Sequence, residues 1–523
     1  MQQSSALNSN KKIYLLVIVC SLLRMIVAST LELGNDEVYY QAYAQHLQWN
    51  YFDHPPMVAL LIRLSTLNLL FTHEFFIRLG PVICAALGTW LIFKIGTFIS
   101  NEQTGLIAAI LYSTSFYSSV IAGIFILPDS PQVVFWLLAE YAMICILESK
   151  VNTGEQNLYF IMLGVSAGLC IMSKVHGIFL WLGFGGYLIF YRRDVLKSRM
   201  LWFSVLITII LISPIFFWNL DNHFVNYIYH QGRIGFLGGR PDLNRLLQQV
   251  FGSVFYSNPV NFIIYILALY AVFKNRFPNP PHIYQLLLWL SFPLIIVLLV
   301  TSVFNETLPH WSGPAYLSLM LVAACWLDER TKSIRVRWLK TAGWFFVTVV
   351  TIGTLSIRFL PLRIGNRRMN YLGTGDITLD MNGWKKFALD FDTLYQSDIR
   401  SGSMKPNAII VSDYWFPAGH LDHYYAMPFH RNLIAFGDLT SIHHFAWLNK
   451  IRPRLIKGTD AYFIYPTNEY GPPMQNLKNE FRSVEDSVLI PQFRAGKLVR
   501  YFVIYRMHHF QGDSSDYLIT GIK

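Results

Sequence analysis

Charge is what this chain has least of. Only 14% of its 523 residues are Asp, Glu, Lys or Arg, whereas 53% are hydrophobic. Soluble domains usually carry about 25% charged residues. The shortfall is uneven, because residues 12–357 are mostly long apolar runs and residues 358–523 have an ordinary soluble composition. We therefore expect a polytopic α-helical membrane domain over 1–357 and a C-terminal extramembrane domain over 358–523.

Cysteine is also scarce, and the chain has no Gly-rich phosphate-binding loop. All five cysteines lie inside apolar runs, with no metal-site spacing, which argues against a disulfide framework. A formal net charge of +11 is compatible with nucleic-acid binding. The basic residues cluster between the apolar runs, however, so we expect no nucleic-acid partner.

A membrane span needs about 20 mostly apolar residues. By this rule eleven spans are expected, near residues 12–30, 77–99, 104–123, 131–148, 157–173, 177–191, 200–217, 254–273, 284–304, 313–327 and 338–357. Lys and Arg concentrate in alternate connections, which is typical of cytoplasmic loops. These connections contain Lys11-Lys12, Lys150 and the stretches 191–199, 274–276 and 328–340. The amino terminus is then cytoplasmic and the C-terminal domain lies outside.

The outer connections hold the unusual polar residues. The first, residues 31–76, includes "LELGNDEVYYQAYAQHLQWNYFDHPP", with Asp36, Glu37 and Asp53 among aromatic rings. We expect two interfacial helices here that hold carboxylates at the membrane surface. Two alternatives stay open: Asp36 caps the following helix, or the loop is a re-entrant packing element. A cleavable signal peptide is not expected, since the first span carries Arg24 and no small-residue cleavage site follows.

The C-terminal domain has the pattern of a small α/β unit. Runs rich in β-branched and aromatic residues predict strands at 407–415, 432–437, 461–466 and 497–507, with a helix near 440–451. Within it, "HLDH" places His420 and His423 three residues apart. A metal site there would need further ligands, so hydrogen-bonded histidines are the favoured interpretation.

The segment "LGNDEVYYQAYAQHLQWNYFDHPPMVALLI" resembles the first outer loop of a known family. The family comprises bacterial glycosyltransferases related to protein O-mannosyltransferases and the lipid A aminoarabinose transferase. They depend on polyprenyl-phosphate sugars and have the C-type glycosyltransferase fold. The resemblance continues through "LPDSP", "SKVHGIFL", "WNLDNHFVNYIYHQGR" and "LPHWSGPAYL", and so covers most of residues 12–330. The C-terminal domain resembles the family's outer α/β domain only loosely.

The resemblance implies functions for individual residues. Asp36 takes the position of the catalytic base, with Glu37 beside it, and Asp129 that of a second acidic residue. Lys174 takes the position of the basic residue that contacts the donor phosphate. The polar cluster after the seventh span corresponds to His230, Gln231 and Arg233.

Three residues of the first loop, Tyr39, Asp53 and His54, are further substrate-binding candidates, with loop ordering as the alternative for His54. The resemblance also implies a multi-pass protein of the bacterial plasma (inner) membrane. Its partners would be a polyprenyl-phosphate sugar, a glycolipid or protein acceptor, and membrane lipids.

The chemistry agrees with these positions. An acceptor hydroxyl has a far higher pKa than a carboxylate, so its proton must leave as attack proceeds, by general base catalysis. Cations such as Lys174 and Arg233 would neutralise the leaving phosphate. One base and one cation pair suffice, with inversion at the anomeric carbon. No cofactor is required, although a divalent metal is left open.

Simpler explanations exist for each residue. In these explanations Lys174 is an interfacial lysine that extends to the headgroups, and Asp129 caps the helix that follows it. Arg233 then serves only to keep its loop soluble. Two other classes of protein compete with an enzyme: a transporter or flippase of lipid-linked sugars, and an assembly protein. A transporter should carry its polar residues near the membrane midplane.

Overall fold

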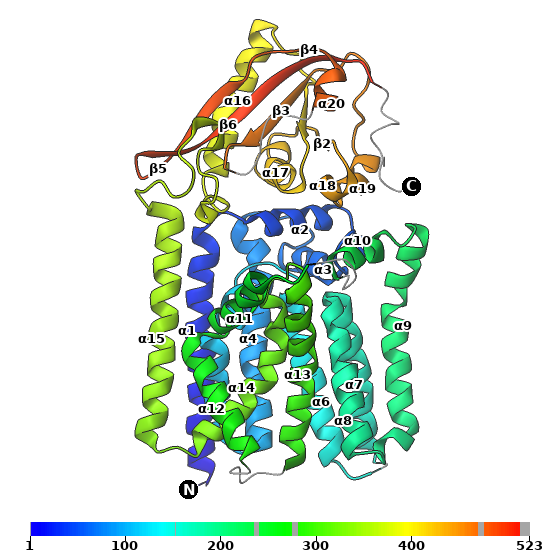
Figure 1. The fold of residues 1–523 in the computed structure, drawn as a ribbon, viewed down its shortest axis with the longest axis vertical. Helices are drawn as coiled ribbons and strands as arrows, with labels where there is room; N and C mark the ends of the chain where they lie inside the picture. Colours follow the sequence, from blue (N-terminus) through cyan, green and yellow to red (C-terminus); the bar gives the residue numbers. More distant parts are fainter. Residues whose placement is uncertain (1, 152, 235–239, 275–280, 469–474, 513–523) are drawn as a thin grey trace. The chain divides into compact units, whose positions relative to one another are not determined.

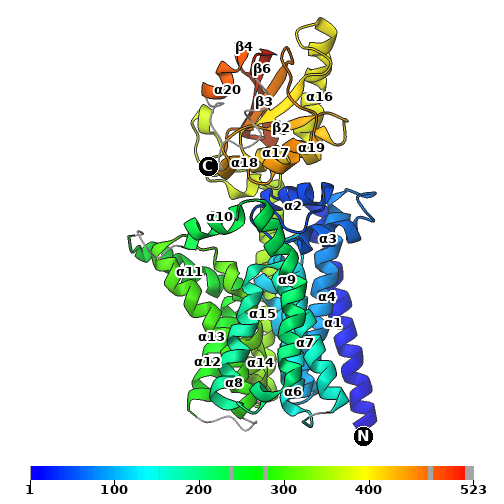
Figure 2. The ribbon, with the colours of Figure 1, turned by 90° about the vertical axis from the view of Figure 1, so that its right-hand side faces the viewer.

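Figures 1 and 2 show the computed structural model, which describes residues 2–151, 153–234, 240–274, 281–468 and 475–512. The chain divides into two compact units. Unit 1 comprises Met1–Ala28 and His54–Val350, and unit 2 comprises Ser29–Asp53 and Thr351–Lys523. Residues 29–53 thus belong with the C-terminal unit, a grouping that composition alone does not indicate.

Unit 1 is helical, and two of its helices, α1 and α15, run on into unit 2 (Figure 1). The helices are α1 (Gln2–Thr30), α3 (Met57–Ser65), α4 (Glu74–Ile99), α5 (Glu102–Thr114), α6 (Asp129–Glu148), α7 (Gly154–Ser173), α8 (Ile178–Tyr191), α9 (Arg199–Asp221), α10 (Val225–Ile234), α11 (Leu243–Ser257), α12 (Pro259–Phe273), α13 (Pro281–Phe304), α14 (Gly313–Asp328) and α15 (Lys332–Phe359). Each of the eleven apolar segments contains one of them. The polytopic character predicted from composition is confirmed.

Seven helices of the described residues are long and apolar enough to cross a membrane, namely α1, α4, α6, α7, α9, α13 and α15. Helices α11 and α12 are bent by 99° at the break between them, and counting them as one span makes eight. Asn258 accepts from the N–H of Val260 and Pro259 opens α12, so a new helix starts at the bend. Helices α5, α8 and α14 occupy the other expected positions but have 13, 14 and 16 residues.

The core of unit 1 is built around α6, most of whose residues are buried. Helices α7 and α9 pack closely, because a Cβ on Gly164 would lie 2.5 Å from the carbonyl oxygen of Ser204. The hydroxyl of Thr208 donates to the carbonyl of Gly164 at 2.9 Å across the same contact. This packing joins the middle of α7, the helix that Lys174 follows, to α9.

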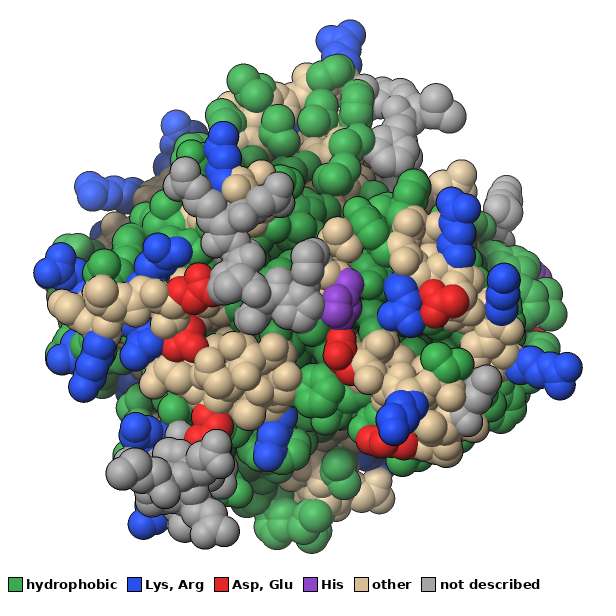
Figure 3. All heavy atoms as spheres, turned by 90° about the horizontal axis from the view of Figure 1, so that it is seen from below, with side chains coloured by type: hydrophobic (Ala, Val, Ile, Leu, Met, Phe, Trp, Pro, Cys, Tyr) green, Lys and Arg blue, Asp and Glu red, His purple; other side chains and the backbone are tan. Residues whose placement is uncertain are grey.

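Exposed basic residues occur in the connections α6–α7 and α8–α9, at the end of α12 and in the first turns of α15, including Lys150, Arg193, Lys197, Lys274 and Arg337. Viewed from below, many Lys and Arg side chains lie toward the outline and others lie nearer the centre, with hydrophobic side chains between them (Figure 3). These are the connections that the Lys and Arg bias assigns to the cytoplasm.

Unit 2 contains a six-stranded mixed sheet with the order β2-β1-β3-β6-β4, in which β5 also pairs with β6. Its strands are β1 (Ile409–Ser412), β2 (Leu433–Ala435), β3 (Ala461–Pro466), β4 (Phe481–Val484), β5 (Val488–Arg494) and β6 (Lys497–Phe510). Strand β1 is parallel to β2 and β3, whereas β3, β4 and β5 are antiparallel to β6. The four predicted strands are confirmed, and β4 and β5 are additional.

Six α-helices lie wholly within the described part of unit 2: α2 (Asn35–Gln45), α16 (Trp384–Ser401), α17 (Trp415–Leu421), α18 (Leu439–Ile442), α19 (Phe445–Ile451) and α20 (Gln475–Asn479). Phe387 of α16 stacks on Phe502 of β6 at 3.9 Å, and Phe391 meets Tyr462 of β3 edge-on. The apolar face of α16 therefore packs on the sheet.

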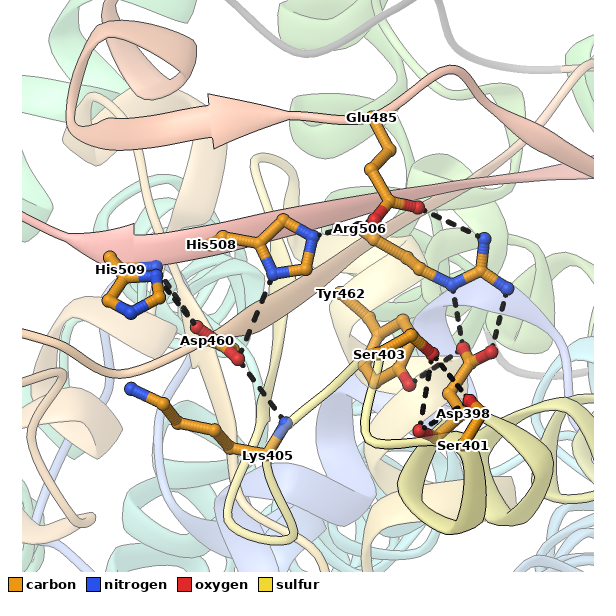
Figure 4. A network of polar contacts seen from close by, with 10 residues as sticks. All are labelled: Asp398, Ser401, Ser403, Lys405, Asp460, Tyr462, Glu485, Arg506, His508 and His509. Carbon is orange, nitrogen blue, oxygen red and sulfur yellow. Dashed lines mark hydrogen bonds and ion pairs between the residues drawn. The ribbon is translucent and has the colours of Figure 1, made fainter.

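A polar network ties α16 to the sheet (Figure 4). Arg506 of β6 binds both carboxylate oxygens of Asp398 at 2.7 and 2.8 Å, and the hydroxyl of Tyr462 donates to Asp398 at 2.9 Å. Arg506 also lies 3.4 Å from Glu485 in the β4–β5 connection. A bidentate pair of this kind fixes direction as well as distance.

Candidate active site

The adjacent carboxylates of α2 have different environments. The N–H of Gly34, the N-cap residue, donates to Oε2 of Glu37 at 2.9 Å. Glu37 is 2% exposed, whereas Asp36 is exposed. The capping function considered for Asp36 therefore belongs to Glu37. Asp36 presents an accessible carboxylate in the first turn of α2.

Asp53 accepts hydrogen bonds from two tyrosines of α2. The hydroxyl of Tyr39 donates to Oδ1 of Asp53 at 3.1 Å, and the hydroxyl of Tyr43 donates to the same oxygen. Residues four apart share a helix face, so both rings point the same way. Burial, followed by the charge of Asp53, raises the pKa of both tyrosines well above their usual value of 10. Both remain neutral donors at physiological pH.

An aromatic cluster supports these tyrosines. Tyr43 stacks on Tyr51 at 3.9 Å, and the ring of His444 meets both edge-on, at 4.9 and 4.8 Å. The backbone N–H of His444 donates to the hydroxyl of Tyr39 at 3.1 Å. Burial lowers the pKa of His444 to about 3, so its ring is neutral. Helix α2 thus has a protein-packed aromatic face, which differs from the amphipathic helix expected to lie against lipid.

In unit 1, Lys174 and Asp129 form a buried ion pair. Lys174 follows α7, Asp129 opens α6, and Nζ donates to Oδ2 at 2.7 Å. The two side chains are 4% and 2% exposed. The hydroxyl of Tyr117 donates to the other carboxylate oxygen, Oδ1, at 3.0 Å. Asp129 is therefore committed to two partners, and Lys174 is held in a fixed position.

Tyr117 lies where the helix changes form. Helix α5 ends at Thr114, and residues Tyr117–Ile121 form a π-helical turn. The hydroxyl of Ser119 donates to the carbonyl of Ser113 at 2.6 Å, which satisfies a backbone group freed by the break. Turns of this type often occur at functional sites.

Histidines surround the pair. His54, His176 and His310 all interact electrostatically with Lys174 or with one another. Desolvation, then the charge of Lys174, lowers the pKa of His310 to about 4, and Asp129 opposes this shift. Hydroxyl-bearing side chains, among them Ser253, Tyr256, Ser312 and Tyr316, surround a crevice next to Tyr117 that has no room for a water molecule. The region offers one fixed cation and neutral hydrogen-bonding groups.

The third predicted cluster lies on α10. His230 is half-buried and within electrostatic range of His176, while Gln231 is exposed. The backbone of Arg233 is helical, but its side chain lies outside the described residues. The glycines at 235, 238 and 239 lie outside them as well.

No group of three or more His, Cys, Asp or Glu side chains with metal-binding geometry occurs in the described part of the chain. The "HLDH" residues instead have separate partners. His420 stacks on Trp384 at 4.1 Å and hydrogen-bonds the Asn35 side chain at 2.9 Å. Asp422 pairs with Arg452 at 2.7 Å.

Sequence reasoning missed Tyr43, Tyr117, His310 and His444. Tyr43 had a usable signal, because it lies one helical turn after Tyr39. Tyr117 and His444 had none, since their partners are distant in sequence or depend on a local break in a helix.

The structure has the fold of the C-type membrane glycosyltransferases. It is similar to the crystal structure of ArnT from Cupriavidus metallidurans in the apo state, with a TM-score of 0.60 and 13% identity, covering 95% of this chain and 98% of that one. The structure of the same protein bound to undecaprenyl phosphate also matches with a TM-score of 0.60. Arabinofuranosyltransferase AftD from Mycobacteria gives a TM-score of 0.52 at 12% identity, covering 96% of this chain and 40% of that one.

Sequence comparison agrees with this fold. Residues 53–218 match the family described as dolichyl-phosphate-mannose-protein mannosyltransferase. The chain is 24% identical over 298 residues to the lipid A galacturonosyltransferase RgtD of Rhizobium johnstonii (strain DSM 114642 / LMG 32736 / 3841). That match covers 56% of this chain and 60% of the relative's length. The resemblance seen in the loop motifs is thereby confirmed.

Proposed function

We propose that this protein is a membrane glycosyltransferase that moves one sugar from a polyprenyl-phosphate donor to an envelope acceptor. The observation that carries the proposal is the similarity of fold along nearly the whole chain to ArnT, which has been solved with undecaprenyl phosphate bound. The acceptor class we favour is lipid A or lipopolysaccharide, because the curated relative acts on lipid A. Another cell-surface glycan or a protein is the alternative acceptor.

Asp36 is the proposed general base. Its carboxylate is exposed in the first turn of α2, whereas neighbouring Glu37 is occupied as a cap. The carboxylate takes the proton of the acceptor hydroxyl as the oxygen attacks the anomeric carbon. The bond from that carbon to the phosphate oxygen breaks, and polyprenyl phosphate leaves. A single displacement inverts the anomeric centre.

Lys174 is the proposed phosphate-binding cation, together with Arg233. A lysine held by Asp129 needs no reorganisation when negative charge develops on the leaving phosphate, which is the condition for efficient electrostatic stabilisation. Tyr39, Asp53, His54, His230 and Gln231 are proposed to bind and orient the substrates.

The reaction is proposed to occur at the outer face of a bacterial inner membrane, with the amino terminus in the cytoplasm. This follows from the basic connections and from the eleven spans expected from the sequence, because an odd number of spans puts the two termini on opposite sides. A reporter fused after Lys523 should be active only when exported. Activity restricted to the cytoplasm would reverse the orientation.

A transporter or flippase of lipid-linked sugars is the second candidate function. Glu140, wholly buried within α6, favours it, because ionisable residues inside spans often line transport paths. Mass spectrometry of envelope lipids and glycans, with and without the gene, separates the two functions. If the protein is a transferase, deleting its gene removes one sugar from a defined acceptor, and the Asp36→Asn variant shows the same loss. If the protein is a flippase, deleting its gene leaves unused donor on the inner leaflet, and the Asp36→Asn variant restores the parent phenotype.

A further inference from the structure

The segment that follows α15 carries an unusual surface. Helix α15, a candidate span, ends at Phe359, and residues 358–377 comprise its last two residues and the chain that follows. Four arginines in this segment are exposed: Arg358, Arg363, Arg367 and Arg368. Six large apolar side chains between and beside them are exposed too: Phe359 (56%), Leu362 (60%), Ile364 (42%), Met369 (59%), Tyr371 (52%) and Ile377 (83%). We refer to residues 358–377 as the basic-apolar loop.

A buried arginine beneath the basic-apolar loop holds its backbone in place. Arg494 of β5 is fully buried and pairs with Asp376 at 3.0 Å. Its guanidinium also donates to the backbone carbonyls of Leu360 and Leu362, at 3.1 and 3.3 Å. A buried charge used in this way orders the backbone on which the exposed side chains stand.

The middle of the loop closes on itself. The N–H of Asn366 donates to the carbonyl of Thr374 at 2.9 Å, and the N–H of Gly373 donates back to the carbonyl of Asn366 at 3.0 Å. Gly365, with φ +82°, makes the turn that starts this closure, since a Cβ there would clash with Thr374. Arg367, Arg368, Met369 and Tyr371 therefore stand on a closed, hydrogen-bonded turn.

Exposed apolar side chains at this density are costly in water. Immediately after a span, however, the chain emerges among lipid headgroups, where apolar side chains enter the acyl boundary and arginines bind phosphates. Each arginine near an anionic surface strengthens the attraction, and no acidic residue occurs between Arg358 and Gly375 to cancel it. A cavity of about 270 Å³ lies beside Arg358 and is also lined by Glu32, Asn382 and Lys385.

We propose that the basic-apolar loop is a docking surface for anionic phospholipid headgroups. It attaches unit 2 to the membrane surface at the end of α15 through Arg363, Arg367 and Arg368, with Leu362, Ile364 and Tyr371 entering the bilayer boundary. The partner is a negatively charged lipid bilayer, and the proposal does not depend on the transferase activity.

The test uses the full-length protein in nanodiscs, with a benzophenone amino acid replacing Tyr371. The discs contain phosphatidylcholine alone or mixed with phosphatidylglycerol. Illumination should give lipid adducts in both, with phosphatidylglycerol enriched several-fold over its share of the bilayer. The triple variant R363Q/R367Q/R368Q should lose this enrichment, and added salt should reduce it in the parent.

A matched variant, R400Q/K457Q/R482Q, removes three exposed charges elsewhere in unit 2. Two of these charges lie far from the basic-apolar loop along β6. Lys457 and Arg482 are next to the Phe510 end of this strand, whereas Arg494, which binds the loop, pairs with the Lys497 end. This variant should keep the enrichment. Adducts with protein alone would show that position 371 does not meet the bilayer. Adducts without enrichment, or loss of enrichment in both triple variants, would refute recognition of anionic headgroups by this loop.

Discussion

Lys174 and Asp129 form a buried pair, with Nζ 2.7 Å from Oδ2, although they are 45 positions apart in sequence. The charge proposed to bind the donor phosphate is therefore already balanced by a carboxylate. Removing one member alone leaves the other buried and uncompensated. A simple Lys174 substitution would consequently mix folding with function.

Lys174→Met alone should lower the free energy of unfolding by about 3–5 kcal/mol. Lys174→Met combined with Asp129→Asn should recover most of this loss. If Lys174 binds the phosphate, the stable double variant should still bind polyprenyl-phosphate sugar roughly tenfold to a hundredfold more weakly. Thermal melts and donor affinity provide the two measurements. Parent-like affinity in the double variant would restrict Lys174 to pairing with Asp129.

The two carboxylates of α2 should separate catalysis from capping. Asp36→Asn keeps the side-chain shape but removes its basicity, so turnover should fall by a factor on the order of 10² or more with little change in stability. Glu37→Ala removes the acceptor for the Gly34 N–H and should cost about 1 kcal/mol of stability. Turnover per folded molecule should change little in Glu37→Ala. The opposite pattern would make Glu37 the base.

His444 should make unit 2 sensitive to acid. Its pKa falls from 6.5 to about 3 on burial, so the unfolded chain binds a proton that the folded chain does not. The stability contributed by the neutral ring is present above pH 6.5 and is lost as pH falls toward 3, by up to about 1.4 kcal/mol per pH unit. His444→Phe keeps a ring against Tyr43 and Tyr51. Melting temperature measured against pH should fall less steeply for this variant. An unchanged acid slope would assign the sensitivity to another group, such as His420 in the same unit.

The bidentate pair between Asp398 and Arg506 should contribute more to the stability of unit 2 than an exposed ion pair of similar length. Asp398→Ala leaves Arg506 and Tyr462 without their shared acceptor and should lower the free energy of unfolding by about 3 kcal/mol. Lys386→Ala breaks the exposed pair with Asp390, at 2.6 Å, and should cost less than about 1 kcal/mol. Denaturant unfolding of both variants gives the comparison. Equal losses would show that Arg506 is satisfied by Glu485 alone.

Much of the fold could be predicted because its signals are local. Apolar runs located the long apolar helices of unit 1, although they missed α11, most of which lies between two of the expected spans. The β-branched runs located β1, β2, β3 and β6. Strands β4 and β5 were not predicted, because their many exposed residues leave no clear run of β-branched and aromatic side chains. In β4 only Phe481 is buried. The break after Thr114 also escaped, since an apolar run looks the same whether its helix is continuous or π-helical.

The candidate site was less accessible to prediction for a different reason. Asp36, Asp129 and Lys174 carry motif signals, but their partners do not. The pairing of Lys174 with Asp129, and of Tyr39 with Asp53 and the His444 backbone, depends on the tertiary fold. Single-sequence reasoning identifies charged residues near span ends, but it does not show which of them are already neutralised.

Helix α2 packs closely on α17, since Tyr39 lies 5.1 Å from the ring of Trp415 and a Cβ on Gly419 would lie 2.9 Å from the Val38 side chain. This packing has a consequence for how the protein is made. Helix α2 ends at Gln45, and α17 begins about 370 residues later, at Trp415. At the usual 5–20 residues per second of synthesis, the tyrosine-rich face of α2 waits roughly 20–70 s for its partner to leave the ribosome. During that interval Tyr39 and Tyr43 lack the cover that the finished unit provides. A chain that stops before Trp415 therefore cannot cover this face of α2.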